Sequence, residues 1–154
     1  MHEFRVTKYD PSKRDDVDRY LDKEEWTDFS DVGNSVSLEE YESVERAYIK
    51  SAVEFIAGSG ITSLKVVGLE DSRRQCQIKE HENISIESLE PVLRALLRGD
   101  CWCRLEGEEG FVHIGWDYYM YIGVNRLDGS AIHNTECRGL YVETFVSPYH
   151  PENR

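Results

Sequence analysis

The chain has 154 residues, of which 40% are hydrophobic and 11% aromatic, and this composition is that of a globular protein with one ordinary domain. Its net charge of −12 disfavours direct binding of nucleic acid or of an anionic membrane. No apolar run is long enough to span a bilayer, and the opening segment MHEFRVTKYD lacks the apolar core of an export signal, so we expect a cytoplasmic protein.

The negative charge is concentrated in one stretch of the chain. Between Asp15 and Glu45, twelve acidic residues are opposed by only two basic ones, so the local net charge is −10. The rest of the chain is close to balanced. A field of this sign attracts a basic partner, although charge runs also serve simply as solvated surface that keeps a protein soluble. Both interpretations stay open at this point.

The first part of the chain predicts a strand followed by loops. Residues 2–9, HEFRVTKY, alternate apolar and polar side chains and favour a short strand. Residues 12–25 carry too many charges for a stable element, so we expect a loop with at most one helical turn. In the segment 24–33, Trp26 and Phe29 lie three residues apart, which indicates a short turn with one apolar face.

A long helix over residues 38–57 has the clearest start in the chain. Ser37 and Glu40 have the spacing of a capping box, in which a hydroxyl and a carboxylate satisfy two free amides. Apolar residues then recur at three- and four-residue steps and predict a stripe that faces the core: Leu38, Tyr41, Val44, Tyr48, Ala52, Phe55 and Ile56. Glu45 lies at the edge of this stripe, and Gly58 or Gly60 ends the helix.

The middle of the chain predicts strands and a second helix. Residues 61–71 are β-branched and favour a strand, and residues 75–86 contain one or two weaker ones. The second helix begins after Ser88, because Pro91 has no amide proton and fits only within a first turn. Its predicted core face is Leu89, Val92, Leu93, Leu96 and Leu97, and Gly99 ends it.

The last third of the chain predicts strands. The segments 101–107, 111–124 and 139–147 alternate in polarity and are separated by turn residues, including Gly107–Gly110 and Asp128–Gly129. The Gly107–Gly110 stretch indicates a hairpin between the first two of these strands. We therefore predict an α+β fold, with two main helices covering one face of a largely antiparallel sheet, as a single domain over residues 1–154.

The aromatic segment 111–124 is expected to form one strand whose faces separate by parity. Its even-numbered residues form the core face: Val112, Ile114, Trp116, Tyr118, Met120 and Ile122. The odd-numbered side is mixed and includes His113, Asp117 and Tyr119, as expected of a solvated face. Asp117 is accordingly assigned to a solvated strand face, to a partner-binding aromatic face, or to the centre of a small-ligand pocket.

The cysteines and histidines predict neither a metal site nor a cofactor. Without an export signal we expect Cys76, Cys101, Cys103 and Cys137 to be reduced. Cys101 and Cys103, with His113 across the hairpin, lack the usual zinc spacing and an evident fourth ligand. His133 and Cys137 lie on a segment predicted to be extended, which puts them roughly 13 Å apart, too far for a catalytic pair. We therefore predict no catalytic residue.

Four stretches in this order carry a resemblance to a known class of protein: FRVTKYDP, EEWTDFSDVG, YESVERAYIKSAVEFI and WDYYMYIG. Together they resemble bacterial immunity proteins of polymorphic and contact-dependent toxin systems. The resemblance implies a small, acidic, cytoplasmic protein that occludes a toxin domain, frequently a basic nuclease. It covers most of the chain and carries over no functional residue.

The hypothesis from sequence is a non-enzymatic immunity or inhibitor protein that binds a basic toxin domain through its acidic surface. The predicted binding residues are the carboxylates Asp28, Asp31, Glu39, Glu42 and Asp117 with the aromatic anchors Trp26 and Tyr119. The alternative is an enzyme or a small-ligand binder with a pocket around Asp117 and the neighbouring tyrosines, and a third class is a structural or regulatory adaptor.

Overall fold

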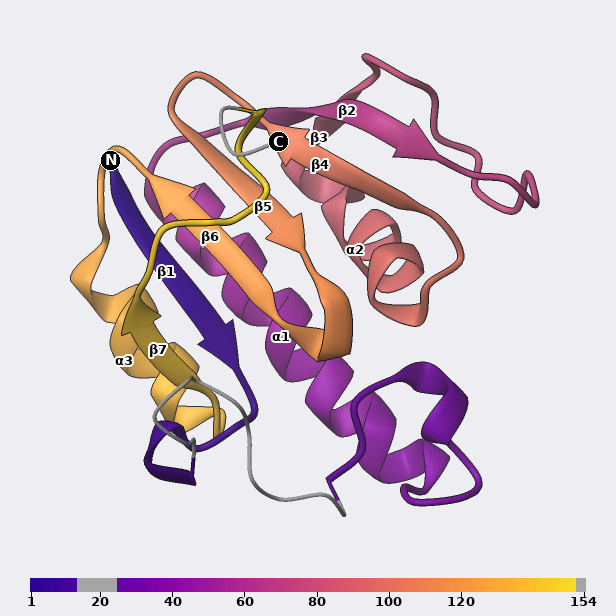
Figure 1. The fold of residues 1–154 in the computed structure, drawn as a ribbon. Coiled ribbons are helices and arrows are strands. Elements are labelled where there is room, and N and C mark those ends of the chain that lie inside the picture. Colours follow the sequence, from indigo (N-terminus) through magenta and orange to yellow (C-terminus); the bar gives the residue numbers. More distant parts are fainter. Residues whose placement is uncertain (14–24, 152–154) are drawn as a thin grey trace.

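Seven strands form a single antiparallel sheet in a computed structural model that describes residues 1–13 and 25–151 (Figure 1). In chain order the strands are β1 (His2–Thr7), β2 (Ser63–Glu70), β3 (Asn83–Ser85), β4 (Trp102–Glu106), β5 (Gly110–Ile114), β6 (Met120–Val124) and β7 (Tyr141–Thr144). Their order across the sheet is β3-β2-β4-β5-β6-β1-β7, and each neighbouring pair is antiparallel. The predicted α+β class with a largely antiparallel sheet is confirmed.

Helices cover one face of this sheet. They are α1 (Leu38–Gly58), α2 (Leu89–Arg98) and α3 (Gly129–Cys137), and Figure 1 shows α1 running behind the central strands with the other two on either side of it. Short 3₁₀ turns are η1 (Pro11–Lys13), η2 (Phe29–Asp31), η3 (Ile86–Ser88) and η4 (Trp116–Tyr118). Among the described residues, no helix is long and apolar enough to cross a membrane.

The first two helices begin and end where the sequence predicts. The Ser37 hydroxyl accepts a hydrogen bond from the Glu40 amide at 3.1 Å, which is the first of the two bonds of the predicted capping box. Pro91 is the third residue of α2, and Gly99 ends that helix in the left-handed conformation, with φ of 76°. The predicted core face of α2 is buried throughout, whereas Leu38 in the α1 stripe is 49% exposed.

The third helix was not predicted. Asp128–Gly129 was assigned to a turn between two strands, but Asp128 is the N-cap of α3. Its carboxylate accepts hydrogen bonds from the Ser130 amide at 3.0 Å and from the Ser130 hydroxyl at 2.8 Å. The helix has only two buried residues, Ala131 and Thr135, so its sequence lacks the long apolar stripe by which α1 and α2 are recognised.

The prediction of one strand over residues 111–124 was wrong, because the chain reverses between β5 and β6. Ile114 lies opposite Met120 in the hairpin, and the Gly115 amide donates to the Tyr119 carbonyl at 2.7 Å to close the turn. Opposed residues share a face of the sheet, and Ile114 and Met120 are both even-numbered. The alternation of polarity therefore continues unchanged through the reversal and hides it.

The second face of the sheet is covered by the C-terminal segment 145–151, which crosses the front of the sheet in Figure 1. The Phe145 amide donates to the Glu3 carbonyl at 3.2 Å, and the Arg5 guanidinium lies 4.0 Å from the centre of the Phe145 ring. Beneath this segment, Phe111 and His113 are buried, with ring centres 4.2 Å apart. The face that was expected to be solvated is thus a second, more polar core.

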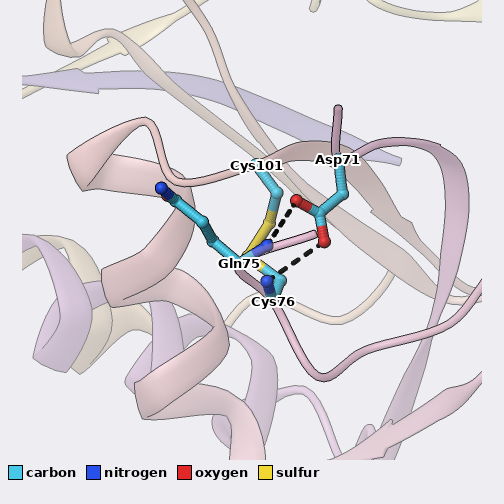
Figure 2. Close-up of a disulfide and its surroundings, with 4 residues drawn as sticks. All are labelled: Asp71, Gln75, Cys76 and Cys101. Carbon is cyan, nitrogen blue, oxygen red and sulfur yellow. Dashed lines mark hydrogen bonds between the residues drawn. A yellow bond between two sulfur atoms is a disulfide. The ribbon is translucent and has the colours of Figure 1, made fainter. Parts of the chain in front are cut away.

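A disulfide joins Cys76 to Cys101, contrary to the expectation of four reduced cysteines (Figure 2). Their Cα atoms are 6.4 Å apart, within the range that disulfides use. Asp71 places Cys76, because its two carboxylate oxygens accept hydrogen bonds from the Gln75 and Cys76 amides, each at 3.0 Å. This local turn brings the loop after β2 onto the start of β4, a contact that cysteine spacing alone does not reveal.

Reducing this disulfide is expected to lower the free energy of unfolding by about 3 kcal/mol, because the bond closes a loop with a sequence separation of 25. Chemical denaturation with and without a thiol reductant measures the change. Alkylation of the denatured, unreduced protein should modify only Cys103 and Cys137, which are free thiols. Cys137→Ser is the matched control and should leave both the stability and its response to reductant unchanged.

Candidate partner-binding surface

The turn between β5 and β6 presents a tryptophan to solvent. Trp116 is 85% exposed, although parity had placed it on the core face of a strand. The next two residues, Asp117 and Tyr118, have φ of 58° and 66°, a left-handed conformation that residues other than glycine adopt rarely. Exposed tryptophan and an unfavourable backbone at one turn are both typical of recognition surfaces.

Three tyrosine hydroxyl groups hold this turn in place. Tyr9 donates to the Asp117 carbonyl at 2.5 Å, and Tyr48 donates to the Tyr118 carbonyl at 2.8 Å. The Tyr118 hydroxyl in turn donates to the Tyr41 hydroxyl at 2.8 Å. The two residues with positive φ are therefore fixed by Tyr9, which follows β1, by Tyr48 of α1 and by the buried side chain of Tyr118. The core beneath the turn thus determines the conformation that exposes Trp116.

The aromatic core under the turn includes Trp26, which had been predicted to be a partner-binding anchor. Trp26 is only 6% exposed, and its ring centre lies 5.2 Å from that of Tyr41 and 5.1 Å from that of Tyr118. The Lys8 ammonium lies 4.1 Å from the centre of the Trp26 ring and pairs with Glu25. Trp26 consequently supports the turn from inside and is not available to a partner.

Below the aromatic core, a buried carboxylate joins α1 to α2. Glu45 is 1% exposed and accepts hydrogen bonds from Arg98 at 2.8 and 3.0 Å and from Arg94 at 3.1 Å. Burial by itself would raise the pKa of Glu45, but hydrogen bonds from Arg98, Tyr41 and Arg94 outweigh burial and hold that pKa below its usual value. The residue predicted to lie at the edge of the α1 stripe is therefore an ionised part of the core.

Through Tyr41 the buried ion pairs are connected to the exposed turn. Burial raises the pKa values of Tyr41, Tyr48 and Tyr118, so all three hydroxyl groups stay protonated at neutral pH. Arg98 donates to Glu45 and Tyr118 donates to Tyr41, and Tyr41 helps to lower the pKa of Glu45, so these buried polar groups follow one another from α2 to the turn. Each of these polar groups is satisfied inside the protein, which makes the arrangement rigid.

Two of the predicted binding carboxylates have structural partners. Asp28 is the N-cap of η2 and accepts hydrogen bonds from the Ser30 hydroxyl at 2.7 Å and the Ser30 amide at 3.4 Å. Asp31 accepts from the amides of Thr27 at 2.9 Å and Asp28 at 3.3 Å. These two acids stabilise the loop over Trp26, and Asp28 is exposed whereas Asp31 is half-buried.

The other acids of the segment divide into two groups. Within the described residues, Glu39, Glu40 and Glu42 make no ion pair and lie in the first turns of α1, next to Tyr41. Glu39 and Glu40 are exposed and Glu42 is half-buried, and together they offer carboxylates to a partner at the start of α1. Asp15, Asp16, Asp18, Asp22 and Glu24, on which part of the charge prediction rests, lie outside the described residues.

Asp117 and Tyr119 flank the exposed tryptophan in different ways. Asp117 is exposed beside Trp116, so it lies on the surface of the turn and not at the centre of a pocket. Tyr119 is half-buried, with its ring centre 5.5 Å from that of Tyr9 and 5.6 Å from the Arg5 guanidinium carbon. Of the two predicted binding residues, Asp117 is therefore more exposed to solvent than Tyr119. Trp116, which parity places in the core, is exposed as well.

On the other face of the sheet, Ser147, His113 and Glu106 have the residue types of a hydrolase triad, but the two nitrogens of the histidine ring are exchanged relative to that triad. The Ser147 Oγ lies 2.7 Å from the Nδ1 of His113, and the Nε2 lies 3.0 Å from Glu106. A nucleophile must reach its substrate, yet Ser147 and His113 are fully buried, and the Ser147 hydroxyl also accepts the Tyr149 amide at 3.2 Å. These contacts anchor the C-terminal segment, and burial lowers the pKa of His113 so that it stays neutral.

The cysteines and histidines considered as metal ligands or catalytic pairs do not lie close to one another, with one exception. Cys101 is in the disulfide, and Cys103 belongs to the core on the helix side of the sheet. The described residues contain no group of three or more side chains that could hold a metal ion. His133 and Cys137 are the exception, since both lie on α3 with Nε2 and Sγ 3.5 Å apart, so the predicted separation on an extended segment was wrong.

Comparison of the chain with family models, with curated proteins and with solved structures found no match in any of the three. The candidate surface is therefore assigned from the residues of this chain alone. They are the Trp116–Asp117 turn, the tyrosines beneath it and the acidic residues in the first turns of α1.

Glu45→Gln is expected to lower the free energy of unfolding by about 3 kcal/mol at pH 7, because it leaves the two arginines without their buried counter-ion. The pKa of Glu45 is lowered in the folded state, so its contribution is complete above the unfolded pKa of about 4.3 and is lost as the pH falls through the folded pKa. Urea denaturation from pH 7 to pH 3 should show the two proteins converging at the acidic end. Glu42→Gln, one turn earlier on α1, is the control and should change stability by no more than about 0.5 kcal/mol.

Tyr48→Phe is expected to cost about 2–3 kcal/mol, because its hydroxyl donates to the Tyr118 carbonyl and accepts the Lys8 amide at 2.7 Å, and both groups lose a partner. Thermal denaturation measures the loss. Tyr141→Phe, at a tyrosine that is 37% exposed, should be nearly neutral. Equal stability of the two variants would contradict the role assigned to Tyr48 in fixing the turn.

Proposed function

We propose that this protein is a non-enzymatic binding protein that recognises a basic protein partner with its Trp116 surface. This surface comprises Trp116 and Asp117 of the β5–β6 turn with Glu39, Glu40 and Glu42 of α1. The observation that carries the proposal is the 85% exposure of Trp116 on a turn whose backbone is held by buried tyrosines.

An exposed tryptophan of this kind favours recognition by burial. A tryptophan side chain removes a large apolar area from water when a partner covers it, and tryptophan is enriched among the residues that dominate binding energy. The turn is also fixed in advance by Tyr9, Tyr48 and Tyr118. A partner then meets a preformed surface, so little conformational entropy is lost on binding.

The acidic residues determine the charge of the partner. The helix α1 begins with Glu39, Glu40 and Glu42 close to Tyr41, whose hydroxyl contacts that of Tyr118 directly beneath the turn. Asp117 adds a fourth carboxylate beside Trp116. A surface with these charges attracts and orients lysine- and arginine-rich proteins and repels nucleic acid.

A toxin domain is the partner class that we propose, on the basis of the resemblance to immunity proteins. A nuclease toxin presents a basic cleft to the phosphates of its substrate, and carboxylates placed as these are would compete for that cleft. Trp116 would then supply the desolvated anchor, with the carboxylates of α1 pairing around it. In this arrangement the protein blocks access to the cleft and performs no chemistry of its own.

The test co-expresses this protein with the products of its neighbouring genes and asks whether a basic nuclease domain co-purifies with it. The association of that domain with the protein is then measured by surface plasmon resonance. Trp116→Ala should weaken affinity by about 30-fold, the loss expected of a dominant interface residue. Val146→Ala is the matched control, since Val146 is 65% exposed on the C-terminal segment, and it should leave affinity unchanged. Equal affinities of the two variants would refute the assignment of Trp116.

A second pair of variants tests the charges. Glu39→Lys with Glu42→Lys should lower the association rate about tenfold at low salt, and added salt should remove most of the difference. Glu108→Lys with Glu109→Lys, in the β4–β5 hairpin at the other end of β5, is the control. Asp28 and Asp31 are left unchanged because their substitution would also disrupt η2. If the association rate depends neither on salt nor on these glutamates, the acidic stretch is a solvated surface and has no role in binding.

A further inference from the structure

A groove of about 500 Å³ is lined by residues between 75 and 100, none of which belongs to the Trp116 surface. One wall is the flank of α2, with Ser88, Pro91 and Ala95. The other wall is the segment 75–78 together with the edge of β3. Buried and half-buried apolar side chains form its floor: Ile78, Ile84, Val92 and Ala95.

The edge of β3 turns main-chain groups toward this groove. The Val66 amide donates to the Glu82 carbonyl at 2.9 Å and the Ile86 amide donates to the Thr62 carbonyl at 3.0 Å, so the even-numbered residues of this stretch bond to β2. In an antiparallel ladder the residues between them direct their amides and carbonyls to the other side. Asn83 and Ser85 therefore point main-chain groups away from β2, and β3 is the last strand of the sheet on that side.

The outer wall of the groove is fixed covalently. Cys76 lies in that wall and is held to Cys101 by the disulfide, while Asp71 fixes the amides of Gln75 and Cys76 (Figure 2). The extended segment after Cys76 consequently stands beside α2 at a set position. A groove with a rigid wall, an apolar floor and an unpaired strand edge has the features of a site that binds a peptide by strand addition.

We propose that this groove binds an extended peptide segment of another protein as an additional strand on β3, with an apolar side chain on the floor and lysine or arginine next to it. Among the described residues, the charged ones that line the groove are Glu82 and Asp100, and both are acidic, so they complement a basic segment. From Ser88 to Ala95 the helix rises about 10 Å, which three or four residues of extended chain cover. This inference does not depend on the Trp116 surface.

The test uses a fluorescein-labelled peptide, acetyl-Lys-Val-Arg-Ile-Lys-Val-amide, and fluorescence anisotropy with the intact, oxidised protein. The peptide should bind saturably, and the same peptide methylated on alternate backbone nitrogens should bind at least tenfold more weakly, because strand addition needs those donors. Hydrogen exchange measured by NMR should show that the peptide protects the Asn83 and Ser85 amides. Equal binding of the methylated peptide, or an absence of saturable binding, would overturn the proposal.

Ser85 allows a matched pair of variants. Its φ of −70° is that of proline, so Ser85→Pro removes only the outward amide and leaves the ladder to β2 intact. Ser85→Ala keeps the amide and removes the hydroxyl that donates to Ser88 at 3.3 Å. Ser85→Pro should weaken peptide binding about fivefold, as the loss of one hydrogen bond predicts, and Ser85→Ala should leave it unchanged.

The control for fold is the thermal melt of both variants, which should match that of the parent protein. Equal peptide affinities of the two folded variants would refute strand addition at β3. The competing occupant of the β3 edge is a second copy of this chain. Sedimentation velocity tests for it by measuring whether the protein dimerises. A dimer that forms as concentration rises, and that Ser85→Pro abolishes, would show that the edge serves self-association and would overturn the peptide proposal.

Discussion

The ion pairs of Glu45 are the interaction on which the rest of this structure depends. A carboxylate that is 1% exposed is costly to bury, and it is tolerated here because Arg94 and Arg98 supply charged hydrogen bonds from a second helix. The same carboxylate lies next to Tyr41, whose hydroxyl accepts that of Tyr118. The packing of α1 on α2 and the backbone of the β5–β6 turn are therefore parts of one polar arrangement, and the position of Trp116 follows from it.

Much of the fold is predictable because its elements are specified locally. The Ser37 cap and the position of Pro91 locate the starts of two helices, and the Gly107–Gly110 stretch locates one hairpin. The other hairpin is hidden because its turn keeps the parity of the strands on either side, so alternation continues from Ile114 to Met120. Tertiary contacts, which local patterns do not encode, also account for α3, for the cover over the outer face of the sheet and for the Cys76–Cys101 disulfide.

The candidate surface was only partly predictable, for a related reason. Charge identifies the acidic stretch, but hydrogen bonding determines which acids stay free. Asp28 and Asp31 bond to amides of their own loop, and Glu45 is buried, whereas Glu39 and Glu42 make no ion pair among the described residues. Two tryptophans have the opposite exposure to the one predicted for them. Trp26 is core and Trp116 is surface, because a turn of two left-handed residues, which composition does not indicate, carries Trp116 outward.

The covering of the sheet limits where recognition takes place. Helices occupy one face of it and the segment 145–151 occupies the other, through the contacts of Ser147 and Tyr149 with side chains of that face. Among the described residues, the outer face of the sheet stays open on β2, at Ser63 and Lys65, and the sheet is otherwise reached at its strand ends and its edges. The Trp116 turn lies at a strand end and β3 lies at an edge, and each is held by separate contacts, one by tyrosine hydroxyls and the other beside a disulfide. The two surfaces are linked through α2, because this helix forms one wall of the groove and its Arg98 bonds to Glu45 beneath the turn. Both therefore depend on the packing of α2 against α1 that the Glu45 ion pairs hold.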